Sequence, residues 1–281
     1  MKTLVKKNTP PVFMILSGPT REYIDPVRYM SNESSGKMGA ELAKQALKKK
    51  SRVIFISGPA SVKPPQKAEV ISVTSALEMF EAAKKNLKKA DIVVIAAAVA
   101  DFRAAAPKKN KIKKGVKAKA LVIRLKKNPD IAAYCGKNKN GRVVAGFALE
   151  TDNLIENAFK KLKNKNLDLI AANGKESLGA DKAAVHLITK LCPSACYGKS
   201  LSRHPARGTM SRSLPCAKPQ GRRVYKLIDS ARENCPRRMT TDVVVKSFKQ
   251  ASKNTIAGKI INETIGIFKS SKAYKKDASG I

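Results

Sequence analysis

The chain has 281 residues, of which 43% are hydrophobic and only 5% aromatic, and its formal net charge is +36. This length allows one substantial core and a small appendage, since domains typically hold roughly 100–200 residues. No run approaches the ~18 uninterrupted apolar residues of a membrane-spanning helix, and five irregularly spaced cysteines do not make the framework of a small secreted protein. These features predict a cytoplasmic protein without a membrane segment.

The positive charge comes mainly from lysines spread over the whole chain. A net positive charge of this size indicates nucleic acid, a membrane surface or an anionic small molecule as a partner, and does not distinguish among them. Dedicated nucleic-acid binders more often combine clustered arginine with aromatic stacking residues, and this chain has no tryptophan. We therefore interpret the lysines as a solvated coat in preference to a nucleic-acid footprint.

Short apolar, β-branched runs alternate with helical patterns through the first 190 residues. The seven runs are Val12 to Leu16, Arg52 to Ile56, Val70 to Val73, Asp91 to Ala98, Leu121 to Leu125, Arg142 to Phe147 and Leu167 to Ala172. Such alternation is typical of βα units around a mainly parallel sheet. The sequence therefore predicts an α/β, Rossmann-like three-layer sandwich.

Four helices are predicted between these runs. They cover residues 37–50, a segment opened by Ser75, a segment for which Asn128 is the N-cap, and about residues 153–163. Ser75 and Glu78 form a capping box at the start of the second helix. The spacing along that helix predicts that Leu77, Phe80 and Leu87 face inward.

The composition changes near residue 190. Most of the arginines and four of the five cysteines lie between residues 191 and 238, and the cysteines and His204 lack the spacing of a zinc site. From Thr240 a lysine-rich, weakly amphipathic pattern is compatible with one or two helices. We expect a basic leader (1–11), one folded domain (12–190) and an Arg/Lys-rich tail (191–281) that an insertion, a divergent end or an out-of-frame translation would each explain.

A loop rich in serine and glycine follows the first predicted strand and ends where a helix begins. It reads GPTREYIDPVRYMSNESSGKMG from Gly18 to Gly39. Small residues let backbone N–H groups approach an anion, and the helix dipole favours negative charge there. The loop is not a P-loop, because Gly36-Lys37 is followed by Met38. Taken alone, such a loop is as well explained as a simple turn of the chain.

The complete string resembles the opening signature of phosphopantothenate-cysteine ligases. The resemblance continues in family order through AAAVADFR (96–103), KIKK (111–114), NPDI (128–131), GFALET (146–151) and LDLIAAN (167–173), over about two thirds of the chain. It implies an enzyme that activates the carboxylate of 4′-phosphopantothenate with CTP, as an acyl-cytidylate, and joins it to L-cysteine. It also implies a homodimer and Mg²⁺ or Mn²⁺, with unassigned metal ligands. No flavin is expected, since only eleven residues precede the first strand.

The resemblance also implies the roles of individual residues. Arg28, Asn32 and Lys111 would be catalytic, and Arg28, Asn32, Ala97 and Ala98 would hold the phosphopantothenoyl group. The nucleotide-binding residues would be Ser34, Ser35, Gly36, Lys37, Met38, Gly39, Ala96, Ala97, Asp101, Lys111, Pro129, Asp130, Ile131, Ala132, Phe147, Lys161 and Lys165. The last two lysines are four residues apart and share one helix face, although a lysine-rich helix offers that spacing freely.

The chain departs from the family pattern in two places. Asn173 is followed by Gly174 and Lys175, where the family usually reads Asn-Asp-Val, and the family's last strand and helix do not follow directly after Ile188. Two alternatives remain open: a basic nucleic-acid-binding protein that retains an inactive ligase fold, and a structural α/β module without activity.

Overall fold

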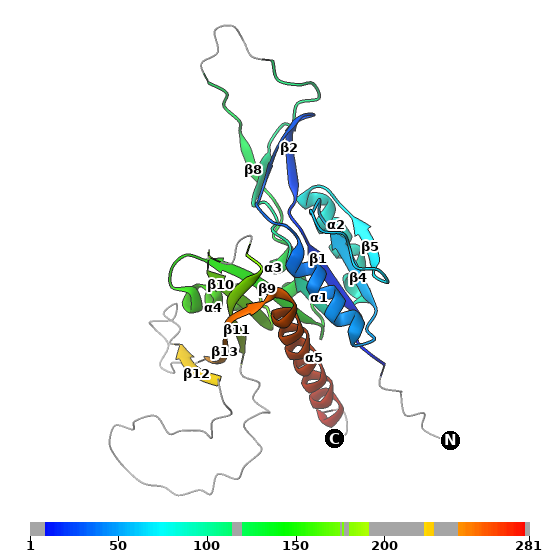
Figure 1. Cartoon of the computed structure of the whole chain (residues 1–281), viewed down its shortest axis with the longest axis vertical. Helices are drawn as coiled ribbons and strands as arrows, with labels where there is room; N and C mark the ends of the chain where they lie inside the picture. Colours follow the sequence, from blue (N-terminus) through cyan, green and yellow to red (C-terminus); the bar gives the residue numbers. More distant parts are fainter. Residues whose placement is uncertain are drawn as a thin grey trace, which may run out of the picture.

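The computed structural model describes residues 9–113, 120–174, 176, 180–190, 222–227 and 241–278. These residues form a nine-stranded sheet and two small two-stranded sheets (Figure 1). From edge to edge the large sheet contains β12 (Arg222–Leu227), β13 (Thr241–Ser252), β11 (Lys182–Lys190), β10 (Leu169–Gly174), β9 (Val143–Glu150), β6 (Ile92–Ile95), β1 (Phe13–Ser17), β4 (Val53–Ser57) and β5 (Glu69–Ser72). The six strands from β10 to β5 are parallel, and β11, β13 and β12 are antiparallel.

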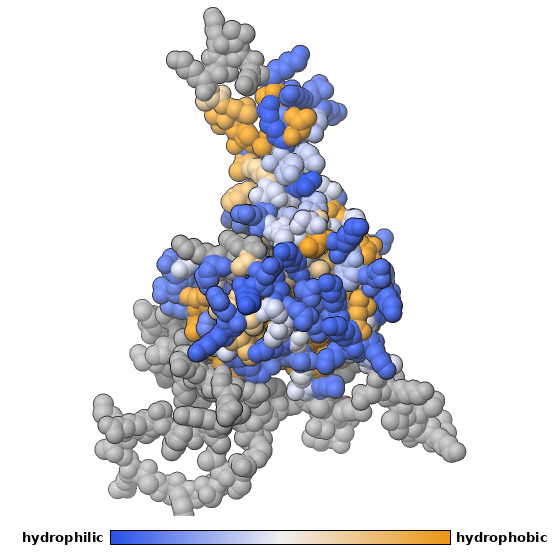
Figure 2. Space-filling view, viewed as in Figure 1, coloured by the Kyte–Doolittle hydropathy of each residue, from blue (hydrophilic) through white to orange (hydrophobic). Residues whose placement is uncertain are grey.

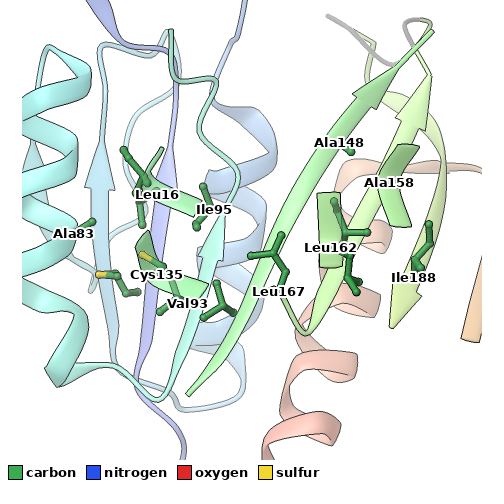
Figure 3. Close-up of a cluster of buried hydrophobic side chains, with 14 of the residues drawn as sticks. Leu16, Ala83, Val93, Ile95, Cys135, Ala148, Ala158, Leu162, Leu167 and Ile188 are labelled. Atoms are coloured by element: carbon green, nitrogen blue, oxygen red, sulfur yellow. The ribbon is translucent and has the colours of Figure 1, made fainter. Parts of the chain in front are cut away.

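Helices cover both faces of the large sheet. They are α1 (Lys37–Lys48), α2 (Ala76–Asn86), the 3₁₀ turn η1 (Leu87–Lys89), α3 (Ile131–Lys137), α4 (Leu154–Asn164) and α5 (Lys253–Ala278). Because side chains alternate along a strand, Phe13 and Ile15 of β1 pack with α1 and α5, whereas Met14 and Leu16 pack with α2, α3 and α4. Figure 3 shows the second of these two cores. The predicted three-layer α/β sandwich is confirmed.

Six of the seven predicted strands lie in the large sheet, and the seventh prediction is wrong. Only Leu125 of the apolar run 121–125 belongs to a strand, β8 (Leu125–Lys127), which pairs with β7 (Phe102–Ala104) outside the large sheet. Leu121 and Val122 are 55% and 86% exposed. The apolar side chains of this run therefore belong to an exposed surface and not to the core.

At α2 the predicted capping box is confirmed, but the prediction that Leu77 faces inward is wrong. Ser75 accepts a hydrogen bond from the Glu78 N–H, and the Glu78 carboxylate accepts one from the Thr74 N–H, so the capping box is present. Leu77 is 43% exposed, however, because Ala76, Met79 and Ala83 form the buried face of α2.

At the third helix, Asp130 rather than Asn128 is the N-cap. Asp130 accepts a hydrogen bond from the Ala133 N–H at 2.9 Å. The Asn128 amide instead donates to the Ala100 carbonyl and accepts from the Arg103 guanidinium. Asn128 therefore joins the segment after β6 to the β7–β8 hairpin.

Residues 241–278 belong to the same folded unit as residues 12–190, which corrects the sequence-based boundary. The expected one or two helices are a strand, β13, followed by one long helix, α5. Val243 and Val245 of β13 are buried where it pairs with β11, and Ile256, Ile260 and Ile261 of α5 are buried in the core that it shares with α1. The sequence hides this arrangement, because a run of valines and a lysine-rich helix carry only a weak periodic signal. The predicted tail cysteines 192, 196, 216 and 235 and His204 lie outside the described residues.

Two hairpins form an arm that projects beyond the sandwich (Figure 1). One pairs β2 (Arg21–Asp25) with β3 (Arg28–Ser31), the other pairs β7 with β8, and β2 contacts β7. Large apolar side chains are exposed on this arm, where Figure 2 shows a group of hydrophobic residues. They are Tyr23, Val27, Tyr29, Phe102, Leu121, Val122 and Leu125. No helix within the described ranges has the length and apolar character to cross a membrane.

The burial of α5 generates a first prediction. Ile260 is fully buried, so Ile260→Ala should lower the free energy of unfolding by about 2–5 kcal/mol through lost apolar contacts and a cavity. Asn262→Ala, an exposed change two residues along the same helix, should stay within about 0.5 kcal/mol. Urea denaturation followed by circular dichroism measures both. Equal midpoints for the two variants would contradict the assignment of α5 to the core.

Candidate active site

Two neighbouring pockets open beside the carboxyl ends of β1 and β6, the edge at which open α/β sheets bind ligands. We call the first the loop pocket; it is lined by Glu33–Gly39, Ala96–Ala98, Phe147, Leu149, Asn173, Ala183, Val185 and Lys253. We call the second the lysine pocket; it is lined by Ile95, Ala97, Val99–Asp101, Asn128–Ala132, Gly146, Phe147, Lys161, Lys165, Leu167 and Ile170. Ala97 and Phe147 line both pockets, so the two are adjacent.

Glycine sets the shape of the loop pocket. Gly36, the N-cap of α1, has a φ of 74°, a left-handed conformation that side chains rarely adopt. A Cβ at Gly39 would overlap the buried Ser17 side chain, so α1 packs directly on the end of β1. The Ser17 hydroxyl donates to the Gly36 carbonyl at 3.2 Å and fixes the loop from below. The loop backbone therefore lies open to the pocket without a side chain at its centre.

The alanine-rich turn after β6 forms the wall shared by the two pockets. The Ala98 N–H donates to the Gly18 carbonyl at 3.0 Å, which holds this turn beside the first loop. The Asn32 amide donates to the carbonyls of Val99, at 3.0 Å, and Ala98, at 3.4 Å. Asn32 thus contacts the turn that was predicted to bind the same substrate group, although it lines neither pocket itself.

Lys161 of α4 and Lys165, the residue that caps the C-terminal end of this helix, both line the lysine pocket. The Lys161 ammonium lies 2.7 Å from a Glu150 carboxylate oxygen, and the Lys165 ammonium lies 2.9 Å from Asp130. Burial opposes the ionisation of Asp130, but hydrogen bonds from the Ala133 N–H and Lys165 outweigh it, so the pKa of this carboxyl lies below its usual value. Both ammonium groups are therefore held in place by carboxylates, of which Asp130 lines the pocket.

Arg28 and Lys111 lie outside both pockets, on the arm. The Arg28 guanidinium is 3.4 Å from Asp25 and donates to the Ile112 carbonyl at 3.2 Å. The buried Asp25 carboxylate accepts N–H bonds from Val27, Arg28 and Ile112. Asp25 and Arg28 together fasten the segment that carries Lys111, which is itself exposed.

With those exceptions, the structure brings the predicted site together. Every predicted nucleotide-binding residue except Lys111 lines one of the two pockets, and so do Ala97 and Ala98 of the predicted substrate-binding set. Lys253 was missed. It lies in the segment whose fold the sequence left unassigned. The available sequence signal for a strand followed by a helix start was the valine run and then Ser252. Ser252 accepts a hydrogen bond from the Thr255 N–H at 3.2 Å.

Other reactive side chains take no part in these pockets. Burial, with a smaller effect of Asp130, raises the pKa of the Cys135 thiol to about 12, so this cysteine stays protonated near neutral pH. His186 bonds the Ser247 hydroxyl across β11 and β13 at 2.7 Å. Within the described ranges, no three His, Cys, Asp or Glu residues gather as a metal cluster. Neither Cys135 nor His186 lines the loop pocket or the lysine pocket.

The fold and the pockets define a Rossmann-like α/β protein whose ligand site is suited to anions. A family model described as "DNA/pantothenate metabolism flavoprotein C-terminal domain" matches residues 11–200, and the chain belongs to this family. It is 43% identical over 179 residues to the coenzyme A biosynthesis bifunctional protein CoaBC of Borreliella burgdorferi, and 44% identical over 180 residues to that of Escherichia coli K12. These matches cover 63% and 62% of this chain.

The same matches cover 46% and 44% of the two relatives, so the chain spans about half the length of the curated proteins that it resembles. A crystal structure of the C-terminal domain of coenzyme A biosynthesis bifunctional protein CoaBC superimposes with a TM-score of 0.63 at 26% identity. That likeness covers 92% of this chain and 96% of the other. The structural likeness thus extends beyond the region of the sequence matches.

Asp25 provides a prediction for the site. Hydrogen bonds from Val27, Ile112 and Arg28, together with the Arg28 charge, outweigh the effect of burial and hold the pKa of Asp25 below its model-peptide value of 3.8. Because the folded-state pKa is lowered, the stabilisation is present above pH 3.8 and is lost as the pH falls through the folded-state value. Asp25→Asn should lower the melting temperature at pH 7, and the difference from the parent protein should shrink below pH 3.8.

Differential scanning calorimetry between pH 7 and pH 3 measures this difference. The matched control is Glu81→Gln, which removes an exposed carboxylate that forms only a surface ion pair with Lys84. A destabilisation by Asp25→Asn that is the same at pH 7 and pH 3 would show that the Asp25 charge does not hold the segment that carries Lys111.

Proposed function

We propose that the chain is a phosphopantothenate-cysteine ligase that uses CTP to join 4′-phosphopantothenate to L-cysteine, giving phosphopantothenoylcysteine for coenzyme A biosynthesis. The observation that carries the proposal is that the two pockets share a wall at Ala97 and Phe147. A nucleotide held by the predicted nucleotide-binding residues of both pockets would meet a phosphorylated acid held at Ala97 and Ala98 on this wall. The motifs that resemble the ligases supply the residues of both pockets, and the two relatives carry coenzyme A biosynthesis in their names.

The first chemical step joins the two anionic substrates. A carboxylate oxygen of phosphopantothenate attacks the α-phosphorus of CTP, an O–P bond forms, and the bond to pyrophosphate breaks with its electron pair leaving on pyrophosphate. Lys161 and Lys165 lie where they can hold the triphosphate, and an incoming phosphate would compete with Glu150 and Asp130 for these ammonium groups. Lysine ammonium groups held in advance at the site lower the cost of bringing two anions together.

The second step forms the amide. The cysteine amine attacks the acyl carbon, a C–N bond forms, the C–O bond to CMP breaks, and the amine loses a proton. Negative charge grows on the carbonyl oxygen during the attack, and this is where a hydrogen-bond donor or a cation lowers the barrier. Asn32 lies beside the shared wall, whereas Lys111 lines neither pocket, so its role in this step would require movement of the segment that carries it. Neither step transfers electrons, so no flavin is required.

Asp101 is the carboxylate that fits a divalent cation. It lines the lysine pocket and, in the part of the chain that the structure describes, forms no ion pair. Mg²⁺ is usually bound by one or two carboxylates together with substrate phosphates, so a dedicated cluster of protein ligands is not needed. We assign Mg²⁺, or Mn²⁺, to this position with CTP, where the ion would neutralise charge on the triphosphate.

The proposed assembly is a homodimer in the cytoplasm. The apolar side chains of the arm make a surface of the kind that protein partners cover, and a second copy of the chain presents the same surface (Figure 2). We expect no membrane partner. The net charge of +36 favours one competing function, nucleic-acid binding by an inactive ligase fold.

Pyrophosphate release tests the function directly. The proposal predicts release only when phosphopantothenate and CTP are both present, and phosphopantothenoylcysteine, detected by mass spectrometry, only when cysteine is added. Asn32→Ala should fold normally and lose turnover, whereas Asn262→Ala should ligate at the parent rate. Salt-sensitive binding to duplex nucleic acid without any pyrophosphate release would support the competing function instead.

Lys111→Gln separates the two steps. This change keeps length and polarity but removes the charge, so acyl-cytidylate formation should persist while cysteine capture slows by about 10²–10³, the usual cost of losing one preorganised donor. Acid quench followed by mass spectrometry should show accumulated acyl-cytidylate. The matched control is Lys113→Gln, a change of an exposed lysine two residues away on the same segment. Ligation by Lys111→Gln at the parent rate would remove Lys111 from the mechanism.

A further inference from the structure

Lys253 brings a cation from the C-terminal segment into the loop pocket. It is the first residue of α5, and it lines the pocket together with the loop 33–39. Its backbone N–H donates to the Asp181 carbonyl at 3.1 Å, and β13 pairs Ser252 with Lys182 immediately before it. On the other side of the helix start, Asn254 accepts a hydrogen bond from the Gln45 amide of α1. Lys253 is therefore fixed by contacts on both sides.

Among the described residues, the charged groups around Lys253 do not give its ammonium a carboxylate partner. Lys37 forms an ion pair with Asp181 at 2.9 Å, and Asp181 is 82% exposed. In the described part of the chain, the Lys253 ammonium has no carboxylate within ion-pair distance, and the neighbouring Glu41 is paired with Lys44. The two ammonium groups thus share the field of one exposed carboxylate, Asp181, which lies in a third pocket that Lys37 and Lys253 also line.

The titration of Lys253 agrees with this geometry. Burial and the nearby Lys37 charge lower the pKa of the Lys253 ammonium, and Asp181 opposes them only in part. An anion bound between the two lysines would relieve both unfavourable effects, since an opposite charge favours the charged form. Because the Asp181 carboxylate is exposed, water already competes for its ion pair with Lys37, and a bound anion can readily displace it.

We propose that Lys253 is a substrate-binding residue that holds a phosphoryl group in the loop pocket, opposite Lys37. This inference rests on the proposed ligase function. The phosphoryl group belongs either to the phosphorylated acid or to the nucleotide, and both present the same chemistry to an ammonium group. In either case α5, which lies beyond the matched residues 11–200, contributes directly to the site as well as to the core.

The test compares Lys253→Gln and Lys253→Arg with a control, Lys249→Gln, which removes an exposed lysine of β13. Steady-state kinetics measures KM and kcat with phosphopantothenate and CTP varied in turn. Lys253→Gln should raise KM for one of them about tenfold with little change in kcat, since it removes a charge-assisted hydrogen bond at a partly exposed position. Arginine should restore most of the affinity, and the control should match the parent protein.

Calorimetric titration with phosphopantothenate, pantothenate and CTP completes the test without any turnover. A weaker Kd for phosphopantothenate but not for pantothenate identifies the acid's phosphate, and a weaker Kd for CTP identifies the nucleotide. Parent affinities for both ligands in a folded Lys253→Gln variant would overturn the proposal. If the parent protein binds these ligands but never ligates, the proposed function fails while the binding role of Lys253 is still decided.

Discussion

β1 pairs in parallel with β4 on one side and with β6 on the other, and the site depends on this pairing. It places the end of β1 beside the end of β6, so that the Gly18 carbonyl accepts a hydrogen bond from the Ala98 N–H. The loop that ends at Gly39 and the alanine-rich turn then both line the loop pocket. β1 is fully buried on both faces, and a one-residue shift of its register would exchange the side chains that fill the two cores, so packing fixes its position.

The charges of the site are arranged in pairs although the chain carries a large excess of cations. Lys37, Lys161 and Lys165 each contact a carboxylate, and those carboxylates lie on other elements of the fold. Partly exposed pairs of this kind contribute little to stability, so their value lies in the position that they give each ammonium group. Lys253 differs in having no such partner within the described ranges. An anionic ligand would complete a charge arrangement that the protein balances only in part.

The arm and the C-terminal segment extend the sandwich in different ways. The arm fastens residues 111–113 through Asp25 and Arg28, and it exposes apolar side chains that the sandwich does not cover. The C-terminal segment adds a strand to the sheet and a helix to one core, and its first helical residue enters the loop pocket. Each extension therefore begins or ends beside the strand ends at which the two pockets lie.

The sequence alone determined most of the local elements and most of the residues that line the two pockets. Alternating apolar runs predicted the parallel strands, Ser75 and Glu78 predicted a helix start, and the motif strings contain most of the residues that line both pockets. Tertiary structure decided three features that no local pattern encodes. Residues 121–125 are exposed on an arm, and Asp130 caps α3 and forms an ion pair with Lys165. Lys253 lines the loop pocket together with residues 33–39. Hydrophobic periodicity indicates whether a residue faces the interior of the protein, but not which distant strand packs against it. Antiparallel pairing of β11 with β13 and the packing of α5 on α1 join residues far apart in the chain, and only their combined burial favours that arrangement.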